Sequence, residues 1–328
     1  MKHISILVPE GDCSLTNIEG THQIFSEVNS FLVRAGKPRL FKIQLVALNK
    51  QAGLKKGFFN VHPDVVISDN IQTDLIIIPA LQGDIKKNLE LNQAFLPWLV
   101  TQYKIGAEIA TLCLGSFLLA STGLLKGRKC ATHWVAANDF KSMFPDVHLV
   151  TDKIITDEQG IYSSGGAYSS LNLILYLVEK FAGRNMAILC SKIFQIEIDR
   201  NSQSPFMIFN AQKDHEDEAI KKAQEFIEQN VQDKITVDQL ALMISVGRRN
   251  LERRFKKATS NTIVEYIQRV KVEAAKMSLE TSRENVNEVM YNVGYTDPKA
   301  FRITFKRITG LSPVEYRNKY NRELAVSY

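Results

Sequence analysis

Short apolar runs alternate with amphipathic helical patterns along residues 4–198 of the chain. The most apolar run is Leu75-Ile-Ile-Ile78, and continuous runs of this kind are typical of strands buried on both faces of a parallel sheet. Further strands are predicted at 4–8, 42–48, 65–67 and 108–112, and helices at 18–32, 88–103, 168–181 and 186–198. The alternation predicts an α/β sandwich.

The periodicity is lost between residues 199 and 215, where polar residues gather around Pro205. This composition is typical of a linker. It would join a first domain at 1–198 to a second at 216–328. The stretch Phe206-Met-Ile-Phe209 is too apolar for a free tether, and we expect part of it to dock on a domain.

The last hundred residues contain one helical device twice. Each copy has an amphipathic helix, a short break and a second amphipathic helix, which is the sequence form of a helix-turn-helix. The first copy spans 237–257 and the second 286–307. The pattern predicts an all-α domain with two helix-turn-helix units, bridged by a long helix at 263–279. The expected apolar face of this bridge comprises Val264, Ile267, Val270, Ala274 and Met277.

The second helix of each copy buries a narrow stripe and leaves a basic face. The stripes are Leu251 with Phe255 and Phe301 with Phe305. The cations outside them are Arg248, Arg249, Arg253 and Lys256 in one copy and Lys299, Arg302, Lys306 and Arg307 in the other. Such a face suits the major groove of double-stranded DNA, and a rigid bridge would let both helices enter successive grooves about 34 Å apart. The alternative is a solvated basic face on an ordinary helical bundle, which the duplication disfavours.

The charge is divided in the same way. Residues 234–328 hold 18 Lys and Arg against 10 Asp and Glu, a net charge of +8, whereas residues 1–233 have a net charge of −2. A basic surplus confined to the C-terminal part fits a nucleic-acid partner there and a different task upstream.

At these residues the chain resembles the AraC/XylS family of bacterial transcription regulators. The resemblance rests on the frame 247–255, on Val293-Gly-Tyr-x-Asp297, on Phe301-x-x-x-Phe305 and on the closing motif 310–317. Three positions depart from the family: Gly247 replaces a capping Ser, Met290 a preferred Ala, and Ile303 a frequent Arg. The last change removes one candidate base contact, while Lys299 and Arg302 remain. The resemblance also makes RNA polymerase a plausible partner.

A candidate reactive residue, Cys113, follows the strand at 108–112 and precedes a small-residue turn and a helix. This is the arrangement of a nucleophile elbow, and the helix N-terminus is expected to favour the thiolate. The alternative is a small buried hydrophobe. Cys13, Cys130 and Cys190 add no metal-ligand spacing, so we expect reduced thiols and no metal or cofactor. Without a secretory signal or an apolar run that could span a membrane, we expect a soluble cytoplasmic protein.

Residues 1–190 resemble the ThiJ/PfpI superfamily, and specifically the amidase-like domain, related to class I glutamine amidotransferases, of GlxA-type regulators. The motifs are the elbow, Gly123-Leu-Leu-x-Gly-Arg128, Thr132-His-Trp134 and Ser163-Ser-Gly-Gly166. The resemblance implies a flavodoxin-like sandwich with a small-molecule pocket at the elbow, and it makes a homodimer plausible. Enzymes of the superfamily pair the Cys with an acid where this chain has Asn17. The proteolytic members carry His where it has Leu114.

The favoured hypothesis is therefore a regulator that senses a metabolite, and not an enzyme. The predicted pocket residues are Asn17, Glu19, Cys113, Leu114 and His133, and a carboxylate at Glu19 would suit an amine or an amino-acid derivative. Only Cys113 and His133 are candidates for catalysis. One alternative is a Cys113-dependent amidase, hydratase or glyoxalase-like enzyme fused to a DNA-binding domain. Another is a redox sensor with a low-pKa thiol at Cys113.

Overall fold

The chain folds into two compact units, Met1–Gln203 and Ser204–Tyr328. The structure is a computed structural model that describes residues 1–50, 54–56, 59–69, 71–198, 200, 202–209, 213 and 215–321. The boundary between the units falls inside the predicted linker. Residues 199, 201, 210–212 and 214 of that linker lie outside the described residues.

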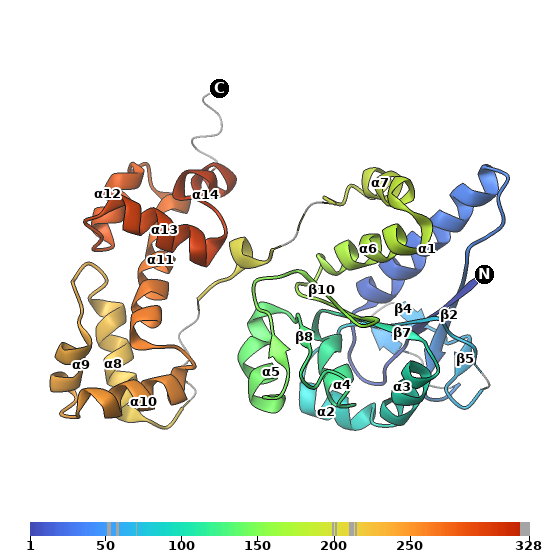
Figure 1. Cartoon of the computed structure of the whole chain (residues 1–328), viewed down its shortest axis with the longest axis horizontal. Coiled ribbons are helices and arrows are strands. Elements are labelled where there is room, and N and C mark those ends of the chain that lie inside the picture. The colour runs from blue at the N-terminus through green and yellow to red at the C-terminus, as the bar shows by residue number, and fades with distance from the viewer. Residues whose placement is uncertain are drawn as a thin grey trace. The chain divides into compact units, whose positions relative to one another are not determined.

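A seven-stranded sheet forms the centre of the first unit, in the order β10-β11-β7-β6-β1-β2-β5 (Figure 1). Its strands are β1 (Lys2–Leu7), β2 (Phe41–Ala47), β5 (Val65–Val66), β6 (Leu75–Ile78), β7 (Glu108–Leu112), β10 (Ile155–Glu158) and β11 (Ile161–Ser164). The five predicted strands are all present and pair in parallel. The sheet is mixed at one edge, where β10, which was not predicted, pairs with β11 in antiparallel register through a two-residue turn. Two further small pairs lie outside this sheet: β3 (Leu54–Lys56) with β4 (Phe59–Val61), and β8 (Lys129–Cys130) with β9 (His148–Leu149).

Helices cover both faces of this sheet, which makes the flavodoxin-like sandwich that was predicted. One apolar core lies between the sheet and α1 (Leu15–Arg34), α6 (Ser170–Ala182) and α7 (Arg184–Ile193). The other lies between the sheet and α3 (Phe95–Lys104), α4 (Ser116–Ala120) and α5 (Ala137–Met143). Strand side chains alternate between the two cores: Ile4 and Ile6 enter the first and Leu7 the second.

The single helix predicted at 88–103 is two helices, α2 (Ile85–Leu91) and α3. The break contains Asn92, whose side chain is buried and holds the loop after β1. Its amide accepts a hydrogen bond from the N–H of Glu10 and donates one to the carbonyl of the same residue. These contacts join the break to a segment 82 residues earlier in the sequence, and the apolar spacing does not reveal them.

The second unit is all helical. It contains α8 (Glu218–Gln229), α9 (Val237–Met243), α10 (Arg248–Thr259), α11 (Ile263–Thr281), α12 (Val286–Asn292), α13 (Pro298–Thr309) and α14 (Pro313–Tyr320). α8, α9, α10 and the first half of α11 enclose one core, and the second half of α11 encloses another with α12, α13 and α14. The two predicted helix-turn-helix units are thus confirmed, with α11 as the bridge between them (Figure 1).

The predicted apolar face of α11 is confirmed for Ile267, Val270 and Ala274, which pack against the two cores, and is wrong for Val264 and Met277. Val264 and Met277 are more than half exposed, whereas Lys271 and Lys276 are buried. Each buried ammonium group donates to backbone carbonyls: Lys271 to those of Val231, Asp233 and Val293, and Lys276 to that of Met207. These hydrogen bonds offset the desolvation of the charge, so lysine can occupy a place that the apolar spacing assigns to hydrophobic residues.

The apolar end of the predicted linker docks on the second unit, as expected. The carbonyl of Pro205 accepts a hydrogen bond from the hydroxyl of Tyr320, and that of Met207 accepts one from Lys276. The N–H of Phe209 donates to the carboxylate of Glu273. Ser204–Phe206 forms a short 3-10 turn, so this segment is part of the helical domain.

Candidate functional site

Helix α10 presents its cations because its apolar stripe fixes its rotation. Leu251 and Phe255 are completely buried in the first core. The predicted DNA-binding residues Arg248, Arg249, Arg253 and Lys256 are all exposed. Gly247, which precedes the helix, offers no capping side chain, and Ser260, which follows it, is in the left-handed conformation.

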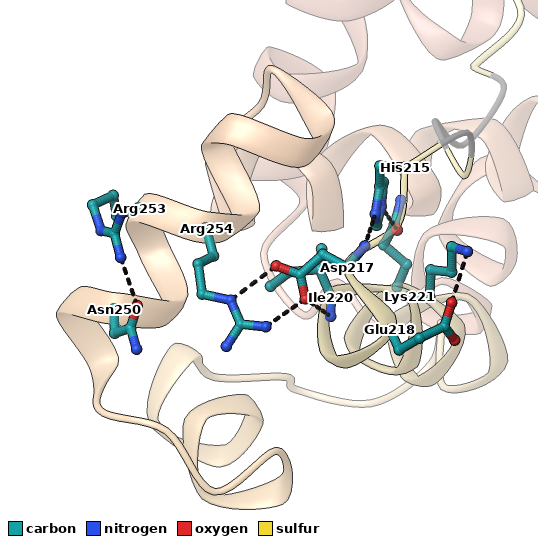
Figure 2. A network of polar contacts seen from close by, with 9 residues as sticks. His215, Asp217, Glu218, Ile220, Lys221, Asn250, Arg253 and Arg254 are labelled. Atoms are coloured by element: carbon teal, nitrogen blue, oxygen red, sulfur yellow. Dashed lines mark hydrogen bonds and ion pairs between the residues drawn. The ribbon is translucent and has the colours of Figure 1, made fainter.

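The cations of α10 fall into two groups by their contacts. Arg254, which was not among the predicted residues, reaches back to Asp217 at the start of α8 and donates two hydrogen bonds to its carboxylate, one of 2.8 Å from Nε (Figure 2). Arg248 forms ion pairs with Asp238 and Glu252. Figure 2 shows Arg253 and its hydrogen-bond acceptor Asn250 on another side of α10 from Arg254.

Arg249 and Lys256 make no polar contact with the described part of the chain. Their charges are therefore available to an external partner. Arg253 has only an exposed amide as its partner, so it too can turn outward at little cost.

Helix α13 repeats this arrangement. Phe301 and Phe305 are buried in the second core, and the side chains of Lys299, Arg302 and Lys306 are exposed and form no hydrogen bond or ion pair with described residues. Its N-terminus is capped by Asp297, whose carboxylate accepts hydrogen bonds from the N–H groups of Lys299 and Ala300. Arg307 is exposed but donates to the side chain of Gln268 on α11.

The turn of the second helix-turn-helix is fixed to the loop after α8. A Cβ on Gly294, which has φ +71°, would lie 2.2 Å from the carbonyl oxygen of Gln232. The ammonium group of Lys271 lies between the same two segments and hydrogen-bonds to both. Sequence reasoning missed this tie, although a lysine four residues after Ile267 within an amphipathic stripe was a signal for it.

The elbow of the first unit has the predicted geometry. Cys113 has φ +54° and ends β7, and a 3-10 turn, Cys113–Gly115, leads into α4. A Cβ on Gly115 would lie 2.5 Å from the carbonyl oxygen of Ile78, which explains the small residue in this turn. The expected thiolate is contradicted, because burial raises the pKa of Cys113 to about 12. Only one hydrogen bond from the following backbone opposes this effect, and α4 is too short to overcome it.

Asn17 and His133 both have structural partners. The buried amide of Asn17 accepts a hydrogen bond from the N–H of Ala80 and donates one to the hydroxyl of Ser170, so it links α1 to the segment after β6 and to the start of α6. His133 is half-buried, and burial lowers its pKa. Its Nδ1 accepts the N–H of Val135, which leaves the proton of the neutral ring at Nε2, available to a ligand.

Thr132 and Gln203 connect the elbow to the end of the first unit. The hydroxyl of Thr132 donates to the carbonyl of Cys113, and the carbonyl of Thr132 accepts a hydrogen bond of 3.0 Å from Nε2 of Gln203. Gln203 is buried although it was predicted to lie in the linker. No sequence signal distinguishes it from the polar residues around it.

Glu19 is exposed on α1. It lines a cavity of about 820 Å³ with His22 and His62, over apolar side chains of α1, β2 and the start of α6. Asn17, Cys113, Leu114 and His133 do not line this cavity. The structure therefore does not bring the five predicted pocket residues together around this cavity.

The described residues contain no cluster of three or more His, Cys, Asp and Glu side chains that could hold a metal ion. None of the helices in the described ranges has the length and apolarity to span a bilayer. An α/β sandwich with an elbow, followed by an all-α unit with two equivalent basic helices, defines the class of two-domain transcription regulators.

Comparisons with known proteins identify both parts. Residues 26–180 match the DJ-1/PfpI family, and residues 240–319 match a helix-turn-helix domain family. The transcriptional regulator GbdR of Pseudomonas aeruginosa is 26% identical over 289 residues, which cover 85% of this chain and 75% of GbdR. The regulator GlxA of Rhizobium meliloti is 23% identical over 66% of this chain and 67% of its own length.

A solved AraC family regulator from Pseudomonas putida has the fold of the first unit, with a TM-score of 0.50 and 16% identity over 59% of this chain and 100% of its own. The chain therefore carries a DJ-1/PfpI domain followed by a helix-turn-helix domain, and it is similar to transcription regulators such as GbdR and GlxA.

Proposed function

We propose that this regulator binds a specific double-stranded DNA site with α10 and α13 and that a small metabolite bound to its first domain alters this binding. The observation that carries the proposal is the equivalence of the two helices. Both have the same length, bury two large apolar residues four positions apart on one edge and expose cations on the other.

The proposed roles follow from the contacts. Arg249, Arg253 and Lys256 on α10, and Lys299, Arg302 and Lys306 on α13, would contact base edges and phosphates. Arg248 and Arg307 already hold partners within the protein. They would have to exchange these partners for phosphates, so we assign them a smaller part in binding.

The arrangement of α11 supports simultaneous use of both helices. α11 enters both cores of the second unit, and Lys271 ties the loop after α8 to the turn before α13. A rigid connection lets the two helices enter successive major grooves without further loss of conformational entropy. We place the protein in the bacterial cytoplasm because its partner is DNA, and we propose that it acts as a homodimer that contacts RNA polymerase.

For the metabolite, we favour the cavity lined by Glu19. One carboxylate above apolar side chains suits a small cation such as an amine, because the acid supplies charge recognition and the walls supply apolar contact. His133 and Leu114 remain proposed ligand contacts at the elbow.

We infer that the elbow is not catalytic. Burial disfavours the thiolate of Cys113, and Asn17 offers an amide that is already hydrogen-bonded where an acid would be needed. Turnover of an amide or dicarbonyl substrate that is lost in Cys113→Ser would instead support the enzyme alternative.

Two experiments test the proposal. In quantitative gel shifts of the full chain on a DNA site selected from random duplexes, Arg253→Ala and Arg302→Ala should each weaken binding, and the control Lys86→Ala, an exposed cation of the first domain, should not. Unchanged affinity in both variants would contradict the DNA-binding role.

For the sensor, a thermal-shift screen with amines and amino acids should give a ligand that stabilises the wild-type first domain but not Glu19→Gln. A ligand in hundredfold excess over its Kd stabilises by about 2.7 kcal/mol. A ligand that stabilises both proteins equally would place the binding site elsewhere.

A further inference from the structure

The two recognition helices are equivalent residue by residue. α10 spans Arg248–Thr259 and α13 spans Pro298–Thr309. The buried positions recur at an offset of fifty: Leu251 and Phe301, Phe255 and Phe305, Thr259 and Thr309. Any two residues with this offset therefore occupy the same place on their helices, and differences between them are differences in what each helix presents.

The central exposed position differs in chemistry between the helices. α10 has Arg253 there, with Asn250 one turn earlier as its hydrogen-bond partner. α13 has Ile303, whose side chain is 59% exposed, with exposed Ala300 one turn earlier. One helix thus presents a hydrogen-bonding pair and the other an apolar pair at matched places.

Ile303 stands within a row of cations. At about 100° per residue, Lys299 and Lys306 lie on the same face, one turn before and one turn after it. A single exposed isoleucine needs no explanation on an ordinary surface. Flanked by lysines that would contact phosphates, however, it would face the floor of the groove in the docked helix.

The edges of the bases offer matching chemistry. Arg and Asn form bidentate hydrogen bonds with guanine and adenine, whereas the C5-methyl group of thymine is the apolar feature of the major groove. We infer that α10 recognises purines through Arg253 and Asn250, while α13 recognises thymine methyl groups through Ile303 and Ala300. The DNA site of one protomer is then asymmetric, with a purine-reading half and a thymine-reading half. This inference rests on the proposed DNA-binding function.

The test uses the full chain and random duplex DNA. Sites are selected with the wild type, Arg253→Ala and Ile303→Ala, and the position at which Ile303→Ala relaxes base preference marks the contact of α13. Thymine at that position is then replaced by deoxyuridine, which lacks only the methyl group. We expect the replacement to weaken wild-type binding about fourfold, the effect of one buried methyl group, and to leave Ile303→Ala unchanged. The same replacement at thymines in the half marked by Arg253→Ala serves as control and should have no effect.

Four other outcomes would contradict the inference or the proposed function. A marked base other than thymine, or an equal deoxyuridine effect in both proteins, overturns the inference while DNA binding stands. In another outcome, Ile303→Ala selects the same bases as the wild type at every position and yet activates transcription in vitro more weakly. That result would overturn the inference and show that Ile303 contacts RNA polymerase instead. Failure of the wild type to enrich any sequence would contradict the proposed function itself.

Discussion

The ammonium group of Lys271 donates a hydrogen bond of 2.9 Å to the carbonyl oxygen of Val293, inside the second helix-turn-helix. Its other two hydrogen bonds go to the carbonyls of Val231 and Asp233, in the loop that precedes the first. All three donors of one buried ammonium are thus used, and they join the two DNA-reading units.

Lys271→Met should destabilise the helical domain by about 1–3 kcal/mol, because it leaves buried carbonyls without donors. It should also weaken binding to a DNA site that requires both units. Both tryptophans, Trp98 and Trp134, lie in the first domain. Tryptophan fluorescence will therefore report the unfolding of the first domain alone, and circular dichroism at 222 nm will report the unfolding of both domains.

Lys276→Met is the matched control, since Lys276 is equally buried on α11 but binds Met207 and Glu273 outside the helix-turn-helix units. We expect a comparable loss of stability with a smaller loss of DNA affinity. Equal losses of DNA affinity in the two variants would show that Lys271 has no special part in holding the two helix-turn-helix units together.

Gly294→Ala should destabilise the domain more than Gly310→Ala. Both glycines have positive φ, so each substitution costs about 1–2 kcal/mol of backbone strain. At Gly294 the new Cβ would also lie 2.2 Å from the carbonyl of Gln232, whereas at Gly310 its nearest neighbour is 3.5 Å away. Equal midpoints of urea unfolding for the two variants would contradict the close approach.

Asp217→Asn should lower the free energy of unfolding of the helical domain by about 1 kcal/mol at pH 7. The substitution can keep the helix cap but removes the charge that pairs with Arg254. Hydrogen bonds from Arg254 hold the pKa of Asp217 below its ordinary value. Since the folded pKa is lowered, the stabilisation is present above about pH 4 and is lost as the pH falls through the lowered pKa. Denaturation curves of wild type and variant at several pH values should therefore converge in acid, and a gap that persists at pH 2 would contradict the ion pair.

All four cysteines are buried, and burial raises the pKa of Cys113, so the native protein should react slowly with thiol reagents at pH 7–8. We expect less than one thiol to titrate quickly before unfolding and four afterwards. Peroxide should leave DNA affinity unchanged. A fast thiol that disappears in Cys113→Ala would restore the redox-sensor alternative.

The fold was largely predictable because buried strands leave short apolar runs, of which 75–78 is the clearest. What the sequence concealed depends on polar side chains with backbone partners. Asn92 divides one apolar spacing into two helices, and Lys271 and Lys276 occupy the core of α11. Hydrophobic periodicity does not register hydrogen bonds of this kind.

The basic helices could be located because the sequence repeats at an offset of fifty. The cavity lined by Glu19 could not be located from the sequence, because its residues come from separate elements. Asn17 and Glu19 are two positions apart on α1, and the helical turn points one toward the segment after β6 and the other into the cavity beside α6. The state of the thiol at Cys113 depends on burial, which motif spacing does not reveal.

Hydroxyl-radical footprinting of the full chain on a selected DNA site tests the central claim most directly. Each protomer should protect two segments one helical turn apart on one face of the duplex. Arg253→Ala should weaken protection of one segment and Arg302→Ala that of the other. A single protected segment, lost equally in both variants, would contradict the account of two helices that bind DNA together.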